Sequence, residues 1–220
     1  MCNPRLNPNN GPMARRTKED ALVTRTLILD AAERVFQRRG VARTALQEIA
    51  QEADLTRGAI YWHFQNKADL FDAMMQRVKL PMVAHLNNLP QAQALHPLLH
   101  LRQSVTRAFH QTVHDQQVRR VLEIASHQVE YGDELQVVRG RRMVERANRV
   151  TDLERLLALA VAQGQLSETI PARVAAVGLH ALLDGLISNW LLDPQAFDLE
   201  VVGAQTLDAY LTGLTVKRPH

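Results

Sequence analysis

The segment Thr44–Lys67, TALQEIAQEADLTRGAIYWHFQNK, decides the fold of the N-terminal part of this chain. Its pattern predicts two short helices joined by a tight turn at Ala53-Asp54-Leu55. We expect Thr44 to cap the first helix, with Gln47 completing a capping box, and Thr56 to cap the second. Apolar residues recur at helical spacing along the first helix and predict one buried face: Leu46, Ile49, Ala50 and Ala53.

The second helix departs from the usual charge distribution of a helix end. Its first turn, Arg57-Gly58-Ala59, contains a cation and no acid, although the positive end of the helix dipole favours Asp or Glu. Lys67 places another cation at the start of the next helix. A phosphate group can supply the missing negative charge, because anions bind well at helix N-termini. The segment therefore predicts a helix-turn-helix that lies on DNA, with an ordinary solvated face as the alternative.

The same residues resemble a known family. Three runs are similar to the DNA-binding signature of the tetracycline-repressor (TetR/AcrR) family: Arg43-Thr44, residues 56–64 and Asn66-Lys67. Residues 13–19 and 28–32 are similar to the lead-in of its multidrug-efflux-repressor branch. The resemblance is dense over about residues 13–80. It implies an all-α, nine-helix, two-domain repressor of a multidrug or solvent efflux operon.

Composition and charge agree with that class. The 220 residues are 46% hydrophobic and contain few Gly and Pro, which favours an all-α protein with a substantial core. Residues 1–67 contain 11 Lys and Arg against 7 Asp and Glu, whereas residues 68–220 contain 15 against 16. The positive excess therefore lies in the N-terminal third, as expected for a part that binds nucleic acid.

Cysteine use and hydropathy predict the compartment. Cys2 is the only cysteine, which excludes an internal disulfide and fits a reducing compartment. The N-terminus is polar, and we find no 18-residue apolar run in the sequence. These features predict a cytoplasmic protein that does not bind a membrane.

We expect three parts: a disordered tail at residues 1–12, a helix-turn-helix DNA-binding domain at 13–75, and a ligand-binding and dimerisation domain at 76–220. Pro81 predicts a kink or an end in the fourth helix. A loop is predicted at 87–97. Further helices are predicted over residues 19–39, 98–114, 117–127, 133–163, 171–192 and 198–214.

The resemblance implies roles in DNA binding for individual residues. Phosphate contacts are expected from Arg43, Thr44, Tyr61, His63 and Lys67. Residues with little bulk or with a forked donor are expected to approach base edges: Thr56, Arg57, Gly58 and Ala59. Trp62 is as consistent with packing against the fourth helix as with contact to DNA.

Asp184 lies in an otherwise apolar helix, where a charge is costly unless it is paired. It either pairs with His180 or with a residue of the helix at 133–163, or it anchors a polar group in a hydrophobic ligand cavity. The resemblance favours the cavity and implies a second polar pocket residue at His110. The predicted site for a small hydrophobic effector consists of His110, Val137, Val144, His180, Leu183, Asp184 and Ile187.

Two apolar surfaces near the C-terminus predict a homodimer, with an intramolecular core as the alternative. The first surface contains Val174, Val177, Gly178, Ala181, Leu182, Gly185 and Leu186. The second contains Leu199, Val202, Leu207, Tyr210, Leu211 and Leu214. A two-fold dimer predicts a roughly palindromic double-stranded operator.

Other chemistries find little support. The pairs His96/His100 and His110/His114 have i, i+4 spacing but lack the Glu of a zinc-hydrolase motif, so we predict no metal and no cofactor. The arginines between residues 139 and 149 predict a solvated face. No nucleophile–base pair or phosphate loop is present, so we predict that the protein is not an enzyme. The alternative to a ligand-responsive repressor is a DNA-binding regulator controlled by a protein partner or without an inducer.

Overall fold

The computed structural model describes residues 12–87, 96–129, 132 and 135–215. All the regular elements in these ranges are helices, which confirms the predicted fold class. They are α1 (Pro12–Arg39), α2 (Leu46–Glu52), α3 (Arg57–His63), α4 (Lys67–Asn87), α6 (Pro97–His114), α7 (Gln116–His127), α8 (Gln136–Ala162), α9 (Ala172–Leu192) and α10 (Leu199–Gly213).

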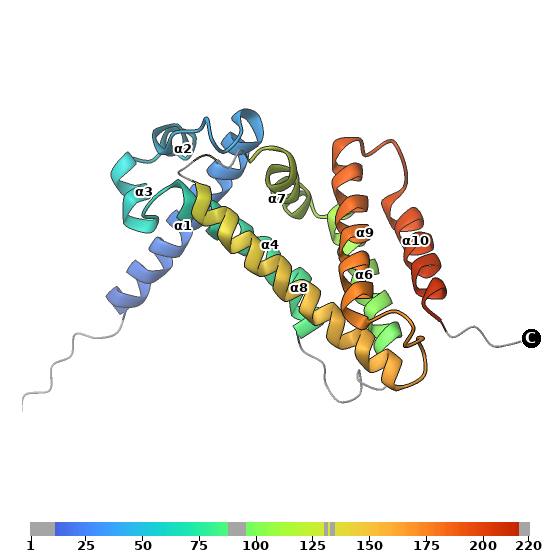
Figure 1. The fold of residues 1–220 in the computed structure, drawn as a ribbon. Helices are drawn as coiled ribbons and strands as arrows, with labels where there is room; N and C mark the ends of the chain where they lie inside the picture. The colour runs from blue at the N-terminus through green and yellow to red at the C-terminus, as the bar shows by residue number, and fades with distance from the viewer. Residues whose placement is uncertain (1–11, 88–95, 130–131, 133–134, 216–220) are drawn as a thin grey trace, which may run out of the picture.

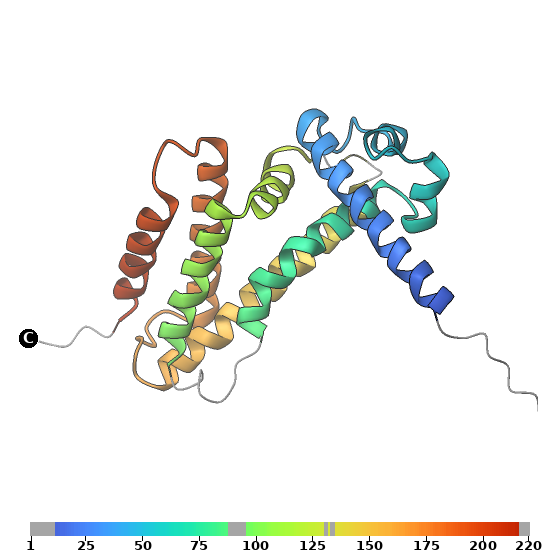
Figure 2. The ribbon, with the colours of Figure 1, turned by 180° about the vertical axis from the view of Figure 1, so that it is seen from behind.

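The helices form two lobes joined by long helices (Figures 1 and 2). The three N-terminal helices lie at one end, α9 and α10 lie at the other, and α4 and α8 run side by side between them. One hydrophobic core joins α1 to α4 with α7 and the start of α8. A second core joins α6, α8, α9 and α10. Leu122 on α7 packs against both cores, so the two lobes are in direct contact through this helix.

A buried carboxylate ties α1 to α4 and α7. Glu33 is 1% exposed, and Arg77 donates to it at 2.8 Å and to Asp30 at 2.6 Å. Gln117 donates to the same Glu33 oxygen at 3.1 Å, and Arg120 lies 3.7 Å from the other oxygen. Burial raises the pKa of Glu33, against the opposing effect of Arg77. The network links the middle of α4 to the helix that contacts both cores.

Several predicted boundaries differ from the structure. Pro81 does not end its helix, because α4 continues to Asn87. A proline costs about 3 kcal/mol in a helix interior, which well-packed preceding turns can offset. The predicted tail and loop lie largely outside the described residues, at 1–11 and 88–95; Pro12 begins α1, and Asn87 and Pro97 belong to helices.

The predicted cap of the first helix-turn-helix helix is also wrong. The N-cap of α2 is Ala45, whose N–H donates to the Glu48 carboxylate at 2.9 Å. Thr44 is buried, and its hydroxyl donates to the Gly40 carbonyl oxygen at 2.7 Å, so it serves the preceding loop instead. The prediction for α3 is confirmed, since the Thr56 hydroxyl accepts from the Ala59 N–H at 3.3 Å.

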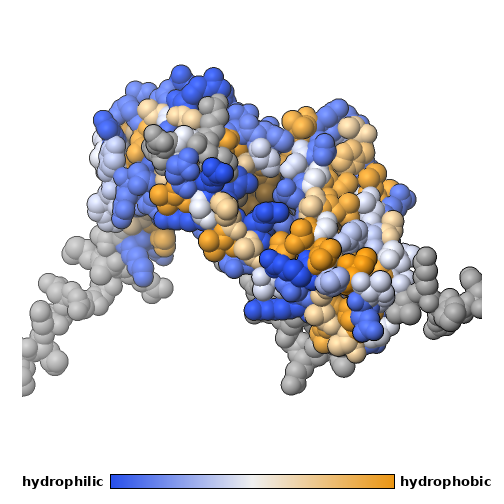
Figure 3. Space-filling model, in the orientation of Figure 1, coloured by the Kyte–Doolittle hydropathy of each residue, from blue (hydrophilic) through white to orange (hydrophobic). Residues whose placement is uncertain are grey.

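One described helix, α9, is long and apolar enough to cross a membrane by length and composition. It spans 21 residues; an 18-residue window of it has a mean hydropathy of 1.4, and 33% of that window is buried. This corrects the expectation that no such run exists. Hydrophobic side chains gather on the surface over α9 (Figure 3). One side of this helix, which includes Val174 and Val177, is therefore not covered by the other described helices of the chain.

Candidate DNA-binding surface and ligand cavity

The helix α3 presents its polar side and two aromatic rings to solvent. Ile60 is fully buried and Phe64 is nearly so, which holds the helix against the N-terminal core. Tyr61 is 46% exposed and Trp62 is 73% exposed. Trp62 does not pack into the core around α4, and its ring lies edge-on to His63 at 4.5 Å between centroids. An exposed aromatic pair beside a polar helix start is available to a large ligand.

Arg57 and Tyr61 form a pair on this surface. The guanidinium donates to the Tyr61 hydroxyl at 3.0 Å and lies 5.2 Å from the ring centroid. Residues four apart on a helix are neighbours, so the contact limits the positions that the Arg57 fork can take. The forked donor is thereby held at the start of α3.

Gly58 lies at the start of α3 in open space. A Cβ added there would meet only the Thr56 hydroxyl oxygen, at 3.8 Å. The fold of this chain therefore does not require glycine at position 58. A glycine at position 58 would, however, allow another molecule to approach the start of α3 closely.

Lys67 and Thr44 are placed differently from the prediction. Lys67 is 5% exposed, and its ammonium group donates to the carbonyl oxygens of Ala42 at 2.8 Å and Thr44 at 3.1 Å. Both side chains therefore hold the segment between α1 and α2 instead of facing outward. Arg43, in the same segment, is exposed.

His63 is partly buried beside Arg25. Burial lowers the pKa of His63, and the positive charge of Arg25 lowers it further. The imidazole is therefore neutral near pH 7. It can donate an N–H to an anion, but it brings no full charge of its own.

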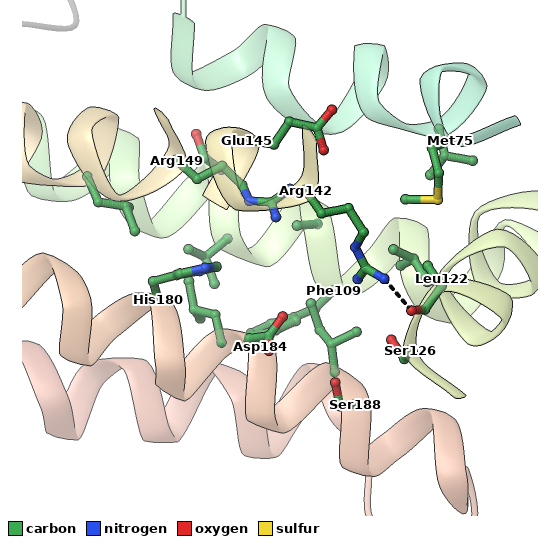
Figure 4. Close-up of a pocket in the computed structure, with 18 of the residues that line it drawn as sticks. Met75, Phe109, Leu122, Ser126, Arg142, Glu145, Arg149, His180, Asp184 and Ser188 are labelled. Carbon is green, nitrogen blue, oxygen red and sulfur yellow. Dashed lines mark hydrogen bonds between the residues drawn. The ribbon is translucent and has the colours of Figure 1, made fainter. Parts of the chain in front are cut away.

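A cavity of about 200 Å³ lies between five helices (Figure 4). This is far more than the roughly 10–15 Å³ that one water molecule needs by this measure. Apolar side chains from α4, α6, α7, α8 and α9 form most of the wall: Met75, Val78, Leu101, Val105, Ala108, Phe109, Leu122, Ala125, Leu153, Leu183 and Ile187. An apolar wall with a few polar groups is typical of a small-molecule site.

The polar groups come from facing helices. Arg149 on α8 points toward His180 and Asp184 on α9 (Figure 4). Burial lowers the pKa of Arg149, while the Asp184 charge acts in the opposite direction. Burial and then Arg149 lower the pKa of His180, so this imidazole is neutral near pH 7. In the described part of the chain, Arg149 and Asp184 interact electrostatically without a salt bridge.

The arginine run of α8 is not a uniformly solvated face. Arg142 lines the cavity and donates to the Ala125 carbonyl oxygen of α7 at 2.6 Å (Figure 4). Arg149 also lines it, whereas Arg141 pairs with Asp72 of α4. The predicted solvated face is therefore wrong for Arg142 and Arg149, because this side of α8 faces the cavity, whereas the Arg141 side chain is 57% exposed.

Two family models match this arrangement of a helix-turn-helix and a helical cavity domain. The model described as "Bacterial regulatory proteins, tetR family" matches residues 28–74, and the model described as "MAATS-type transcriptional repressor, C-terminal region" matches residues 96–216. The chain belongs to the tetR family. Repressors of this family bind operator DNA and act as dimers.

Known relatives of this regulator are similar over most of their length. It is 42% identical over 188 residues to the HTH-type transcriptional regulator TtgR of Pseudomonas putida, covering 85% of this chain and 89% of that protein. NalD, the secondary repressor of the MexAB-OprM multidrug efflux pump in Pseudomonas aeruginosa, has a TM-score of 0.82 and 35% identity, covering 91% of this chain and 100% of that one. The SmeT–triclosan complex has a TM-score of 0.78 and 32% identity, covering 89% and 93%. SmeT represses the multidrug efflux pump SmeDEF of Stenotrophomonas maltophilia.

Part of the predicted ligand site lies at the cavity of the regulator and part does not. His180, Leu183, Asp184 and Ile187 line it. His110 does not, because it follows Phe109 on α6 and successive helical residues point about 100° apart. Val137 and Val144 are 58% and 60% exposed and lie outside the wall.

Sequence reasoning missed the wall residues on α6 and α7. Phe109, Leu122 and Ser126 line the cavity. The first two have the helical spacing of ordinary core residues, and a serine carries no signal alone. Their role depends on helices distant in sequence, so the local pattern contains no sign of it.

The predicted dimer surfaces of the regulator are partly used within the chain. Val174 and Val177 on α9 are 58% and 41% exposed. Gly178, however, faces α10, where an added Cβ would lie 2.5 Å from the Tyr210 hydroxyl oxygen. The buried leucines of α10 and its C-cap belong to the second core: Leu199, Leu207, Leu211 and Leu214. The second apolar surface is therefore wrong as a dimer surface for these four residues, which pack against the chain's own helices.

Proposed function

We propose that this regulator is a cytoplasmic, homodimeric repressor of a multidrug efflux operon, released from its operator by a small hydrophobic effector in the cavity. The observation that carries the proposal is the position of α4. Met75 and Val78 of this helix line the cavity, and both also contact the core around the DNA-binding helices. The similarity to NalD and SmeT supports an efflux operon as the target.

On the DNA side, residues 13–75 form the binding domain and residues 76–220 the regulatory domain. The exposed Arg43, Tyr61 and Trp62, with neutral His63, contact the backbone. Thr56, Arg57, Gly58 and Ala59 approach base edges, and a two-point contact from Arg57 to guanine contributes about 1–3 kcal/mol of discrimination. Thr44 and Lys67 act indirectly, by holding the segment that carries Arg43.

Release requires that the effector prefer the conformation that does not fit the operator. Filling the cavity displaces α4 near Met75, and α3 moves with it because both helices share one core. The two recognition helices of the dimer then no longer match the two half-sites. A hundredfold preference of the effector for the released conformation corresponds to about 2.7 kcal/mol of coupling.

The charges of the cavity narrow the class of effector. The wall is mostly apolar, while Arg149 is partly withdrawn from water and has no salt-bridge partner in the described structure. An acidic oxygen on a hydrophobic molecule would supply that partner. The proposed effector is therefore a hydrophobic compound with a carboxylate or an acidic phenol.

The exposed side of α9, which includes Val174 and Val177, faces the second protomer. This accounts for a helix that is apolar but only partly covered in one chain. Lipid could cover the same apolar side of α9. A DNA-bound dimer explains it without requiring Asp184 to enter a membrane, which would be costly. A two-fold dimer binds a roughly palindromic operator.

The alternative is a DNA-binding regulator, not an enzyme, that a protein partner controls or that has no inducer. A filled core around Asp184 would favour it. The cavity between α4 and α9 favours a small effector instead.

A mobility-shift titration on DNA from upstream of the regulator's own gene tests the proposal. Added triclosan, or a hydrophobic carboxylic acid, should release the complex at concentrations that leave the protein folded. Arg57→Ala should change the base preference at one position of each half-site. Binding that no hydrophobic compound weakens would favour the alternative, and absence of any shift would remove the DNA-binding assignment for this target.

A further inference from the structure

Two helices bring three potential metal ligands together on the surface, away from the cavity. Nδ1 of His110 lies 2.9 Å from Oε1 of Glu200, and Nε2 of His114 lies 3.0 Å from Oε2 of the same carboxylate. The two imidazoles belong to the last turns of α6, and Glu200 lies in the first turn of α10. The three ligand atoms all lie within 4.8 Å of one another.

The arrangement has the donor chemistry of a zinc site. Two imidazole nitrogens and one carboxylate oxygen are the ligand set of several open zinc sites, in which water fills the remaining position. Zinc–nitrogen and zinc–oxygen bonds of about 2.0–2.2 Å place neighbouring tetrahedral ligands roughly 3.4 Å apart. The side chains are 60%, 54% and 34% exposed, so small rotations can close the set without displacing buried groups.

A hydrogen-bonded cluster without metal is the simpler explanation of the same contacts. Each imidazole would donate its proton to Glu200, and these contacts lower the pKa of the carboxylate. A hydrogen bond to Glu200 would, however, need only one of the two imidazoles. A chelate requires instead that the ligand atoms surround one position, and here one ligand atom from each of the three residues lies within 4.8 Å of the other two.

We propose that His110, His114 and Glu200 bind a divalent transition-metal ion of the zinc class and that this ion joins α6 to α10. The site is separate from the effector cavity and does not depend on the proposed function. It also revises the expectation of no metal, because the sequence shows the two histidines but not the carboxylate, which lies 86 residues beyond His114.

The ion would stabilise a contact that is already close. One residue before His110, Phe109 packs against Gly203 of α10, one turn beyond Glu200. A metal at this position therefore holds the two helices together beside the cavity wall. Binding to the folded state alone raises the melting temperature, by roughly 5–10 °C at a hundredfold excess over Kd for a protein of this size.

Calorimetric titration of the untagged protein with zinc chloride tests the site. All proteins carry Cys2→Ser so that the single thiol does not contribute. The wild-type site should bind one Zn²⁺ per chain, and zinc should raise its melting temperature reversibly on addition of EDTA. Glu200→Gln and His114→Ala should each weaken binding at least tenfold and abolish the thermal shift.

The matched control is His96→Ala, which removes an exposed histidine from another i, i+4 pair on the same chain and should leave zinc binding unchanged. Glu200→Gln keeps an oxygen acceptor for the imidazoles, so a folded variant is available even if His114→Ala does not fold. Equal zinc binding by the wild type and Glu200→Gln would overturn the proposal. So would the absence of a zinc-dependent thermal shift in the wild type.

Discussion

Phe109 and Gly203 are packed so closely that glycine is required at position 203. A Cβ there would lie 2.4 Å from Cε2 of the Phe109 ring, which lines the cavity. The ring therefore forms part of the cavity wall and also sets the approach of α6 to α10. Gly203→Ala must move either the ring or the helix.

We expect Gly203→Ala to lower the free energy of unfolding by about 1–3 kcal/mol, because overpacking strains a filled core. Effector affinity should change as well, since the ring is displaced. Urea unfolding and effector titration measure the two effects. Gly213→Ala on the same helix, where a Cβ meets no atom within 4 Å, should have neither. Equal behaviour of the two variants would contradict the packing argument.

Lys67→Ala is expected to reduce stability by about 1–3 kcal/mol, because it leaves the buried carbonyl oxygens of Ala42 and Thr44 without this donor. Arg43→Ala should leave stability unchanged and reduce the salt dependence of DNA binding by about 0.9 in log–log slope, as for one lost phosphate contact. Chemical unfolding and binding at several salt concentrations separate the two. If Lys67→Ala is as stable as the wild type but has a reduced salt slope, Lys67 contacts a phosphate directly, as the sequence predicted.

Gly58→Ala should weaken operator binding at least tenfold while leaving the protein as stable as the wild type or slightly more so, by up to about 1 kcal/mol. The reason is that a methyl group fits the free protein, where only Thr56 lies within 4 Å, but faces the DNA. Gly140→Ala on α8, also in open space, is the control and should bind DNA normally. If Gly58→Ala binds the operator with unchanged affinity, the DNA does not lie against position 58.

Arg149→Leu should reduce the response to acidic hydrophobic effectors more than tenfold and preserve the response to neutral ones, because it removes one of the two arginines that line the cavity, the one to which we assign the anion. Arg139→Leu changes an exposed arginine of the same helix and should leave both responses intact. Release of DNA measured with matched acid and amide compounds gives the comparison. Equal loss for both compounds would indicate general damage to the cavity.

Glu33 predicts a pH dependence of stability. Burial raises the pKa of Glu33 above 4.5 in the folded state, so this group takes up protons on folding. Its contribution to the free energy of unfolding is complete below about pH 4.5. The contribution is lost as the pH rises through the pKa of the folded state. The wild type should therefore lose stability relative to Glu33→Gln as pH rises across that window. Urea unfolding at pH 5, 6 and 7, at one protein concentration, tests the sign. If the wild type instead became more stable relative to Glu33→Gln as the pH rises, the charge of Arg77 would have a larger effect on the pKa of Glu33 than burial has.

Much of the fold was predictable because its signals are local. Thr56 caps α3 as expected, and the helices predicted over residues 171–192 and 198–214 lie within one residue of α9 and α10. Two wrong predictions, the cap at Thr44 and a helix end at Pro81, share a cause: each residue has a local preference that tertiary packing overrides. Thr44 is drawn into the loop after α1, and α4 continues through the proline.

The site was predictable where one helix carries the signal. Asp184 is conspicuous because a charge in an apolar helix needs a reason, and it does line the cavity. Arg149 and Phe109 were not recognised, since an arginine in a charged run and a phenylalanine in a core helix look ordinary. His110 was assigned to the cavity but points to Glu200 instead.

The sequence by itself determined an all-α chain with a helix-turn-helix between Thr44 and Lys67, because caps, apolar spacing and charge act within a few residues. Only the tertiary structure decided which polar groups meet. Lys67 faces inward, Arg149 faces Asp184, and Glu200 reaches two histidines of α6. Each of these relationships depends on the rotation and approach of helices far apart in the chain, which packing of the whole molecule fixes.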